Sequence, residues 1–170
     1  MSERIFAYGS NMCSRRLRDY SVVPEERGRA AVLQDHRLCF NKKSRKDGSG
    51  KANVERHAGA DVWGVLYAIR DSDLQTLDHG EGPGYFRKKM PVHTIDGAET
   101  EGWVYFACRS TRDPALRPYT WYRRFLVEGA KEHGLPAEYI EALGRIEAIP
   151  DKNRQRDAEK RALMCRADLA

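Results

Sequence analysis

The sequence predicts an α+β fold, in which a mixed β-sheet or small β-barrel forms the core and helices pack outside it. Strand-like segments come first in the chain, and the helical periodicity of apolar residues becomes strong only in its last third. A hydrophobic fraction of 41% and a charged fraction of 32% over 170 residues suit one globular domain with its own core. We expect that domain to span residues 1–150, followed by a charged, weakly helical tail at 151–170.

The strands are recognised by runs of aliphatic and aromatic residues between turn-forming segments. Residues 61–69 are apolar on both alternating faces, which is typical of a central strand covered on two sides. The predicted strands are 4–8, 30–40, 61–69, 86–95 and 101–108, with a turn at 96–97 between the last two. Residues 41–59 carry Asn and Gly among Lys, Ser and Asp, which indicates a mobile surface loop.

A short helix is predicted directly after the central strand. Asp71 or Ser72 can cap its start, and Leu74 and Leu77 lie three residues apart on one face. The helix is expected to break at the glycine-rich segment 79–84.

The last third of the chain predicts two amphipathic helices. Apolar or small residues between 122 and 130 recur at i, i+3, i+4, i+7 and i+8, and Gly134 can terminate this helix. Pro136 is suited to the first turn of the next helix, and Pro150 to its end.

Composition narrows the classes of function. The four cysteines and five histidines lie far apart without metal-ligand spacing, so we expect no metal site and no disulfide framework. No apolar run approaches membrane-spanning length, and the start of the chain lacks a signal-peptide pattern, so a cytoplasmic protein is expected. The net charge of +5 suggests acidic small molecules or weak nucleic-acid contact as partners.

The segment Tyr8-Gly9-Ser10-Asn11, at the end of the first strand, allows three interpretations. It can be a plain strand-to-helix turn, with Gly9 supplying conformational freedom and a polar residue capping the helix. Its successive backbone N–H groups can also bind a carboxylate or an oxyanion. Finally, Ser10 can be a nucleophile, although the segment lacks the second glycine of a nucleophile elbow and no partner histidine stands out.

Three side chains further along the chain are candidates for a ligand site. Glu81 lies between glycines, which allow backbone to approach a ligand, and desolvation in a cleft would let it act as both base and acid. Tyr85 can wall such a pocket. Tyr105 lies in a predicted strand and is either a core aromatic residue or a hydroxyl donor to a ligand carboxylate.

Three separated segments together resemble the γ-glutamylcyclotransferase family. They are FAYGSNM at 6–12, DVWGVLYAI with LDHGEGPGYFRKKMPV between 61 and 92, and EGAKEHGLPAEYIEALGRIEA at 128–148. LQDHRLCF at 33–40 also fits the family's second strand, so the resemblance covers about residues 4–150 in order.

The resemblance implies release of 5-oxoproline from a small-molecule γ-glutamyl substrate, by attack of the substrate's own α-amine on its γ-carbonyl. It assigns proton transfer to Glu81, and substrate binding to the turn from Tyr8 to Asn11, with Gly9 and Ser10 between them. Tyr85 and Tyr105 would complete the substrate site. No metal, cofactor or nucleophilic serine is needed for this chemistry.

Two alternatives stay open. The same fold and residues can act on γ-glutamylamines or on a γ-glutamyl-protected metabolite. The basic cluster at 42–46 can instead belong to a non-catalytic binding module, although nucleic acid is disfavoured as a partner because regular aromatic interleaving is absent. Whether the protein forms a homodimer is also left open.

Overall fold

In a computed structural model of the protein, which describes residues 1–165, five strands form a closed barrel in the order β1-β3-β2-β4-β5. The strands are β1 (Ser2–Ala7), β2 (Arg29–Lys43), β3 (Gly50–Arg70), β4 (Tyr85–Thr94) and β5 (Glu99–Ala107). β1 is antiparallel to β3 and parallel to β5, so the sheet is mixed. The predicted α+β fold with a small barrel is confirmed.

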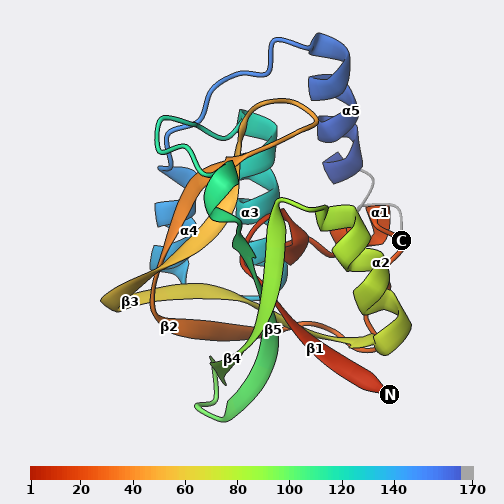
Figure 1. The fold of residues 1–170 in the computed structure, drawn as a ribbon, viewed down its shortest axis with the longest axis vertical. Helices are drawn as coiled ribbons and strands as arrows, with labels where there is room; N and C mark the ends of the chain where they lie inside the picture. The colour runs from red at the N-terminus through yellow and green to blue at the C-terminus, as the bar shows by residue number, and fades with distance from the viewer. Residues whose placement is uncertain (166–170) are drawn as a thin grey trace.

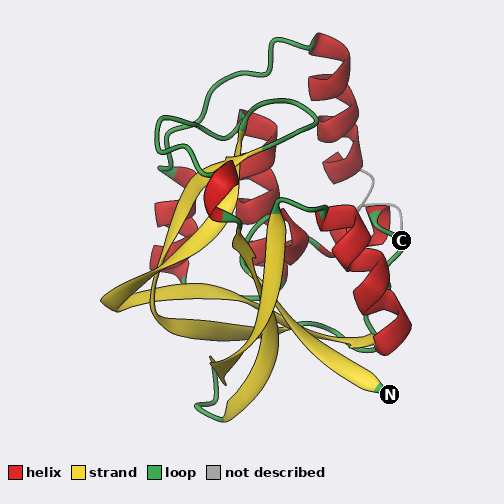
Figure 2. Ribbon diagram, viewed as in Figure 1, coloured by secondary structure: helices red, strands yellow, loops and turns green. Residues whose placement is uncertain are grey.

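The helices gather mainly at one end and one side of the barrel (Figures 1 and 2). They are η1 (Ser10–Met12), α1 (Ser14–Asp19), α2 (Asp71–Glu81), η2 (Arg109–Thr111), α3 (Thr120–Glu132), α4 (Ala137–Gly144) and α5 (Arg154–Cys165). The tail predicted at 151–170 therefore contains a helix, and residues 166–170 lie outside the described residues. Within residues 1–165, no helix has the length and apolar character needed to cross a bilayer.

The first strand closes the barrel. Ile5 pairs with Tyr67 on β3 and with Trp103 on β5, which joins the two edges of the sheet. Tyr67 is buried, and its hydroxyl donates a 2.7 Å hydrogen bond to the carbonyl of Met12. This bond ties the barrel wall to the turn that follows β1, because a buried hydroxyl needs a partner.

The prediction of a mobile loop at 41–59 is wrong. β2 extends to Lys43 and β3 starts at Gly50, so only a short turn separates them. The polar residues that suggested a loop are satisfied inside the sheet: buried Asn53 accepts the Ala107 N–H (2.9 Å) and donates to Asn41 (3.0 Å). These hydrogen bonds offset the cost of burying the side-chain amide groups. Their partners are distant in the sequence, so a local sequence pattern does not indicate them.

The boundaries of α2 also differ from the prediction. Arg70 occupies the N-cap position, and neither Asp71 nor Ser72 caps the helix with its side chain. The helix does not break before the glutamate, because Glu81 is its last residue and Gly82 is its C-cap. Glu81 is therefore held by a helix rather than by a loop.

The fourth helix is shorter than predicted. Pro136 is its N-cap rather than a residue of its first turn, and the helix ends at Gly144, well before Pro150. Proline fixes a φ that is compatible with either position at a helix start. The proline therefore locates the start of the helix to within one residue, but not its end.

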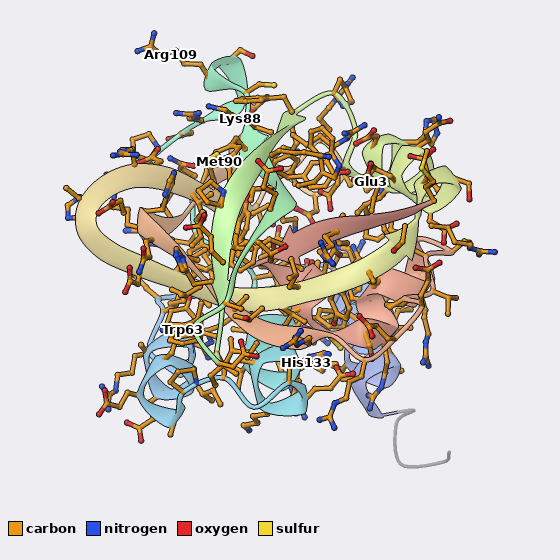
Figure 3. All side chains as sticks on the ribbon, turned by 90° about the horizontal axis from the view of Figure 1, so that it is seen from below. Glu3, Trp63, Lys88, Met90, Arg109 and His133 are labelled. Carbon is orange, nitrogen blue, oxygen red and sulfur yellow. The ribbon has the colours of Figure 1, made fainter. Side chains whose placement is uncertain are left out.

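Helix α3 carries the predicted apolar face, with Tyr122, Phe125 and Gly129 buried. It packs on the turn η1 so closely that a Cβ added at Gly129 would lie 2.4 Å from the backbone nitrogen of Cys13. Figure 3 shows His133, at the end of α3, where the helices meet the barrel, and Arg109 projecting away from the molecule. Helix α3 thus fixes the position of the turn after β1.

Candidate active site

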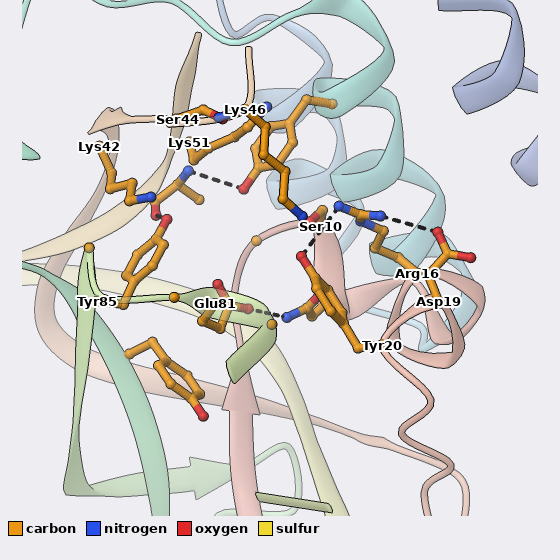
Figure 4. Close-up of a pocket in the computed structure, with 18 of the residues that line it drawn as sticks. Ser10, Arg16, Asp19, Tyr20, Lys42, Ser44, Lys46, Lys51, Glu81 and Tyr85 are labelled. Atoms are coloured by element: carbon orange, nitrogen blue, oxygen red, sulfur yellow. Dashed lines mark hydrogen bonds and ion pairs between the residues drawn. The ribbon is translucent and has the colours of Figure 1, made fainter. Parts of the chain in front are cut away.

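A pocket of about 760 Å³ opens where the turn after β1, the end of α2 and the β2–β3 turn meet (Figure 4). Helices α1, α3 and α5 supply further parts of its wall. All seven predicted site residues line it: Tyr8, Gly9, Ser10, Asn11, Glu81, Tyr85 and Tyr105. Segments far apart in sequence are therefore brought to one cavity.

Glu81 and Asn11 are joined across this pocket by a hydrogen bond. The Asn11 Nδ2 group donates to Glu81 Oε1 at 2.6 Å. Burial raises the pKa of the Glu81 carboxyl above its ordinary value, while the hydrogen bond from Asn11 and the positive charges of Arg16 and Lys42 oppose that shift. The carboxyl is half-buried, so it lies among protein atoms and is still reachable from the cavity.

The glycines beside Glu81 have structural roles in the fold. A Cβ at Gly80 would lie 2.4 Å from the ring of Tyr20, so only glycine lets this ring pack against α2. Gly82 has a φ of 72° and ends the helix, a conformation that glycine adopts at little cost. Gly80, Gly82 and Gly84 also line the pocket, so the expectation that glycines let a ligand approach the backbone stays a prediction.

The turn after β1 presents backbone N–H groups. Within residues 1–165, the N–H groups of Gly9, Ser10 and Asn11 have no hydrogen-bond acceptor, whereas those of Met12 and Cys13 donate to the turn itself. Neighbouring N–H groups of this kind can bind an anionic group. No histidine in the described part of the chain is hydrogen-bonded to Ser10, so nothing there activates it as a nucleophile.

Three of the pocket's tyrosines donate their hydroxyl protons to other protein groups. Tyr8 donates to the carbonyl of Tyr105, and Tyr85 donates to the carbonyl of Ala52 at 2.7 Å. The Tyr105 hydroxyl donates to Asp78 at 2.7 Å, so it is not the free donor to a ligand carboxylate that was expected. Burial raises the pKa of all three phenols, so they remain neutral walls of the pocket.

Several pocket residues were not identified from the sequence. Lys42 and Lys46 were recognised only as part of a basic cluster, yet both line the cavity. Tyr122 was assigned to the core face of a helix, and its hydroxyl accepts the backbone N–H of Ala52 at 3.1 Å. Their sequence signals were local charge and helical periodicity, and neither indicates which elements meet at a pocket. The described residues contain no group of three or more His, Cys, Asp or Glu side chains placed to hold a metal ion.

The barrel and the cavity beside its first strand define the general class of protein. Residues 61–143 match the model of the AIG2-like family. A solved structure described as a γ-glutamyl cyclotransferase superposes with a TM-score of 0.83 at 28% sequence identity, covering 95% of this chain and 99% of the other. The fold is therefore that of the γ-glutamyl cyclotransferase class.

Curated relatives define the family more closely. The γ-glutamylcyclotransferases of Bos taurus and Mus musculus are 35% and 36% identical to this chain over 154 residues, which cover 84% of this chain and 77% of each relative. The chain belongs to the γ-glutamylcyclotransferase family, as its resemblance to that family predicted.

Proposed function

We propose that the protein is a γ-glutamylcyclotransferase that converts γ-glutamyl compounds to 5-oxoproline and a free amine. The α-amine nitrogen attacks the γ-carbonyl carbon, and the amide bond to the second amine breaks. The two protons lost by the α-ammonium equal those gained by the leaving amine, so no water is consumed. The nucleophile is part of the substrate, which supplies a high effective molarity once the chain is folded for attack.

Glu81 would transfer the protons. As a carboxylate it accepts a proton from the α-ammonium, and as a carboxylic acid it returns a proton to the leaving nitrogen. A raised pKa favours this double role, because a general acid–base group works best when its pKa approaches the working pH. Asn11 orients the carboxyl through the 2.6 Å hydrogen bond. The placement of Glu81 in the cavity, hydrogen-bonded to the turn after β1, is the observation that carries the proposal.

The turn from Gly9 to Asn11 would bind the glutamyl part of the substrate. Its N–H groups have no acceptor among the described residues, so they can donate to the α-carboxylate or to the oxyanion that forms at the γ-carbonyl. Tyr85 and Tyr105 would shape the cavity with their rings, since their hydroxyls are engaged elsewhere.

The test is product analysis with the purified full-length chain. γ-Glutamyl-alanine, γ-glutamyl-glutamine, glutathione and γ-glutamyl-ε-lysine are incubated separately in water enriched in ¹⁸O, and products are identified by mass. We expect unlabelled 5-oxoproline from at least one compound, because the attack is intramolecular. Turnover of the lysine compound alone would favour the γ-glutamylamine alternative.

A blocked substrate provides the matched control. The N-acetyl derivative of the best substrate has no nucleophilic α-amine and should release nothing. Labelled glutamate as the product would instead indicate hydrolysis, and an absence of product from the whole panel would contradict the proposed activity.

Asn11→Ala is expected to move the acidic limb of the pH profile of kcat/KM to higher pH. The hydrogen bond from Asn11 lowers the pKa of Glu81, so its loss lets burial raise that pKa further. The base form then appears only at higher pH, and kcat/KM falls most on the acidic side. The profile is measured from pH 4 to 9, with Gln75→Ala on the exposed face of α2 as control. An unchanged limb in Asn11→Ala would contradict the coupling.

A further inference from the structure

The pocket is larger than a glutamyl group requires. Its volume of about 760 Å³ lies within the range of roughly 300–1,000 Å³ that holds drug-sized ligands. The glutamyl part would occupy the region between the turn after β1 and Glu81. The remaining space lies against the β2–β3 turn and α5, where the leaving amine of a substrate would project.

Lysines and arginines outnumber acidic residues in the lining of this cavity. Three of the basic side chains have acidic partners: Arg16 with Asp19 at 3.1 Å, Lys51 with Asp47 at 2.9 Å, and Arg156 with Asp151 at 2.6 Å. These three pairs are neutralised within the protein. They do not account for the remaining positive charge.

Four further basic residues of the lining, Arg45 and three lysines, form no ion pair among the described residues. Lys42 comes from the end of β2, Lys46 from the β2–β3 turn and Lys160 from α5, and all three line the cavity. We call them the lysine triad. Figure 4 shows Lys42 and Lys46 beside the pocket on the wall above Glu81. The nearby acid Glu159 accepts a hydrogen bond from Gln155 at 3.0 Å and is not within ion-pair distance of Lys160.

Lys42 forms no ion pair among the described residues, although the nearby charge of Glu81 favours its charged form, and only 6% of its surface is exposed. Its ammonium lies 4.8 Å from the centre of the Tyr85 ring. Its aliphatic stem packs against Gly84, where an added Cβ would lie 2.6 Å from the Lys42 Cε. Burial of an ammonium group is costly unless a negative charge compensates it. Burial accordingly lowers the pKa of Lys42. A bound anion would offset that cost.

We propose that the lysine triad binds the leaving amine of the substrate and selects leaving amines that carry at least two negative charges, such as an acidic amino acid. This inference rests on the proposed function. The α-carboxylate of the glutamyl part is assigned to the backbone N–H groups of the turn, so it does not use the lysines. A neutral amino acid as leaving group brings one carboxylate to three ammonium groups, whereas an acidic one brings two, and the Coulomb attraction rises accordingly.

The test compares two substrates of nearly equal shape, γ-glutamyl-glutamate and γ-glutamyl-glutamine, which differ by one negative charge. We expect the native protein to favour the glutamate compound by about tenfold in kcat/KM at low ionic strength. The preference should shrink as salt is added, because mobile ions screen partly exposed charges.

Variants that remove a positive charge show which lysines cause the preference for the glutamate compound. Lys42→Gln combined with Lys46→Gln should bring the ratio close to one, mainly by raising KM for the glutamate compound. Lys46→Gln alone changes an exposed side chain in a turn, so it keeps the test valid if the double variant fails to fold, and it should reduce the ratio in part. Lys43→Gln is the matched control, because Lys43 is adjacent in sequence and exposed and does not line the cavity.

The outcomes separate the two proposals. Equal kcat/KM for both substrates in the native protein, or a preference as large in Lys46→Gln as in the native protein, would overturn the role of the lysine triad while 5-oxoproline release still stands. A failure to release 5-oxoproline from either compound and from the wider panel would reject the cyclotransferase activity itself.

Discussion

Replacing Glu81 with Gln should lower kcat for 5-oxoproline release by about 10²–10⁴-fold, the range in which a positioned acid–base group contributes. Glutamine keeps the shape of the side chain, and its amide oxygen can still accept the hydrogen bond from Asn11. It cannot accept a proton from the α-ammonium or return one to the leaving nitrogen. The loss should therefore appear in kcat more than in KM, measured as initial rates of product formation at saturating substrate.

The same variant should not lose stability at neutral pH. The pKa of Glu81 is raised in the folded protein, so the folded state binds the proton more tightly than the unfolded state does. Ionised Glu81 therefore lowers the free energy of unfolding at every pH above the raised folded-state pKa. This destabilisation disappears below the pKa of glutamate in the unfolded state, which is about 4.3. Urea unfolding at pH 8 and pH 4 should show Glu81→Gln at least as stable as the native protein at pH 8.

Glu138→Gln is a suitable control, since Glu138 is exposed on α4 and away from the pocket. It should keep full activity and an unchanged pH profile. Turnover by Glu81→Gln near the native rate would remove Glu81 from the mechanism. Loss of activity together with a loss of cooperative unfolding would point to damage of the fold instead.

Local signals were sufficient for much of the fold and for the turn after β1 and Glu81 in the candidate site. The alternation in residues 61–69 identified the central strand, and the small residues after β1 identified the turn at Gly9. The glycines around Glu81 and the family resemblance both indicated Glu81, and the structure gives two of these glycines roles in the fold. Gly80 admits the Tyr20 ring, and Gly82 ends α2.

The long β2–β3 hairpin was missed because its polar residues are satisfied by distant partners. Asn53 is paired with Asn41 and with the backbone of β5, and a window along the sequence does not contain that contact. Once this segment was assigned to a loop, Lys42 could not be placed in a pocket wall. The charge of the basic cluster was visible in the sequence, whereas its location depended on how the barrel closes.

Among the helical glycines, Gly129 should be the one at which replacement by alanine lowers the free energy of unfolding most. A Cβ at this position would lie 2.4 Å from the backbone nitrogen of Cys13 and 2.5 Å from the carbonyl carbon of Met12. Backbone atoms cannot rotate away as a side chain does, so α3 and the turn must separate. Overpacking of this kind costs about 1–3 kcal/mol, which exceeds the gain of up to about 1 kcal/mol in helix propensity from replacing glycine with alanine.

Gly144→Ala gives the matched comparison, because Gly144 is also helical and a Cβ there meets nothing within 4 Å. It should leave the free energy of unfolding unchanged or raise it slightly, while Gly129→Ala lowers it, as measured by urea denaturation.

At temperatures where Gly129→Ala remains folded, its kcat should also fall. The turn that contains Asn11 rests on α3, and a shift of that turn displaces the side-chain amide of Asn11 from Glu81. Equal stability of the two variants would show that helix and turn move apart at little cost, and normal kcat in Gly129→Ala would show that the turn tolerates displacement.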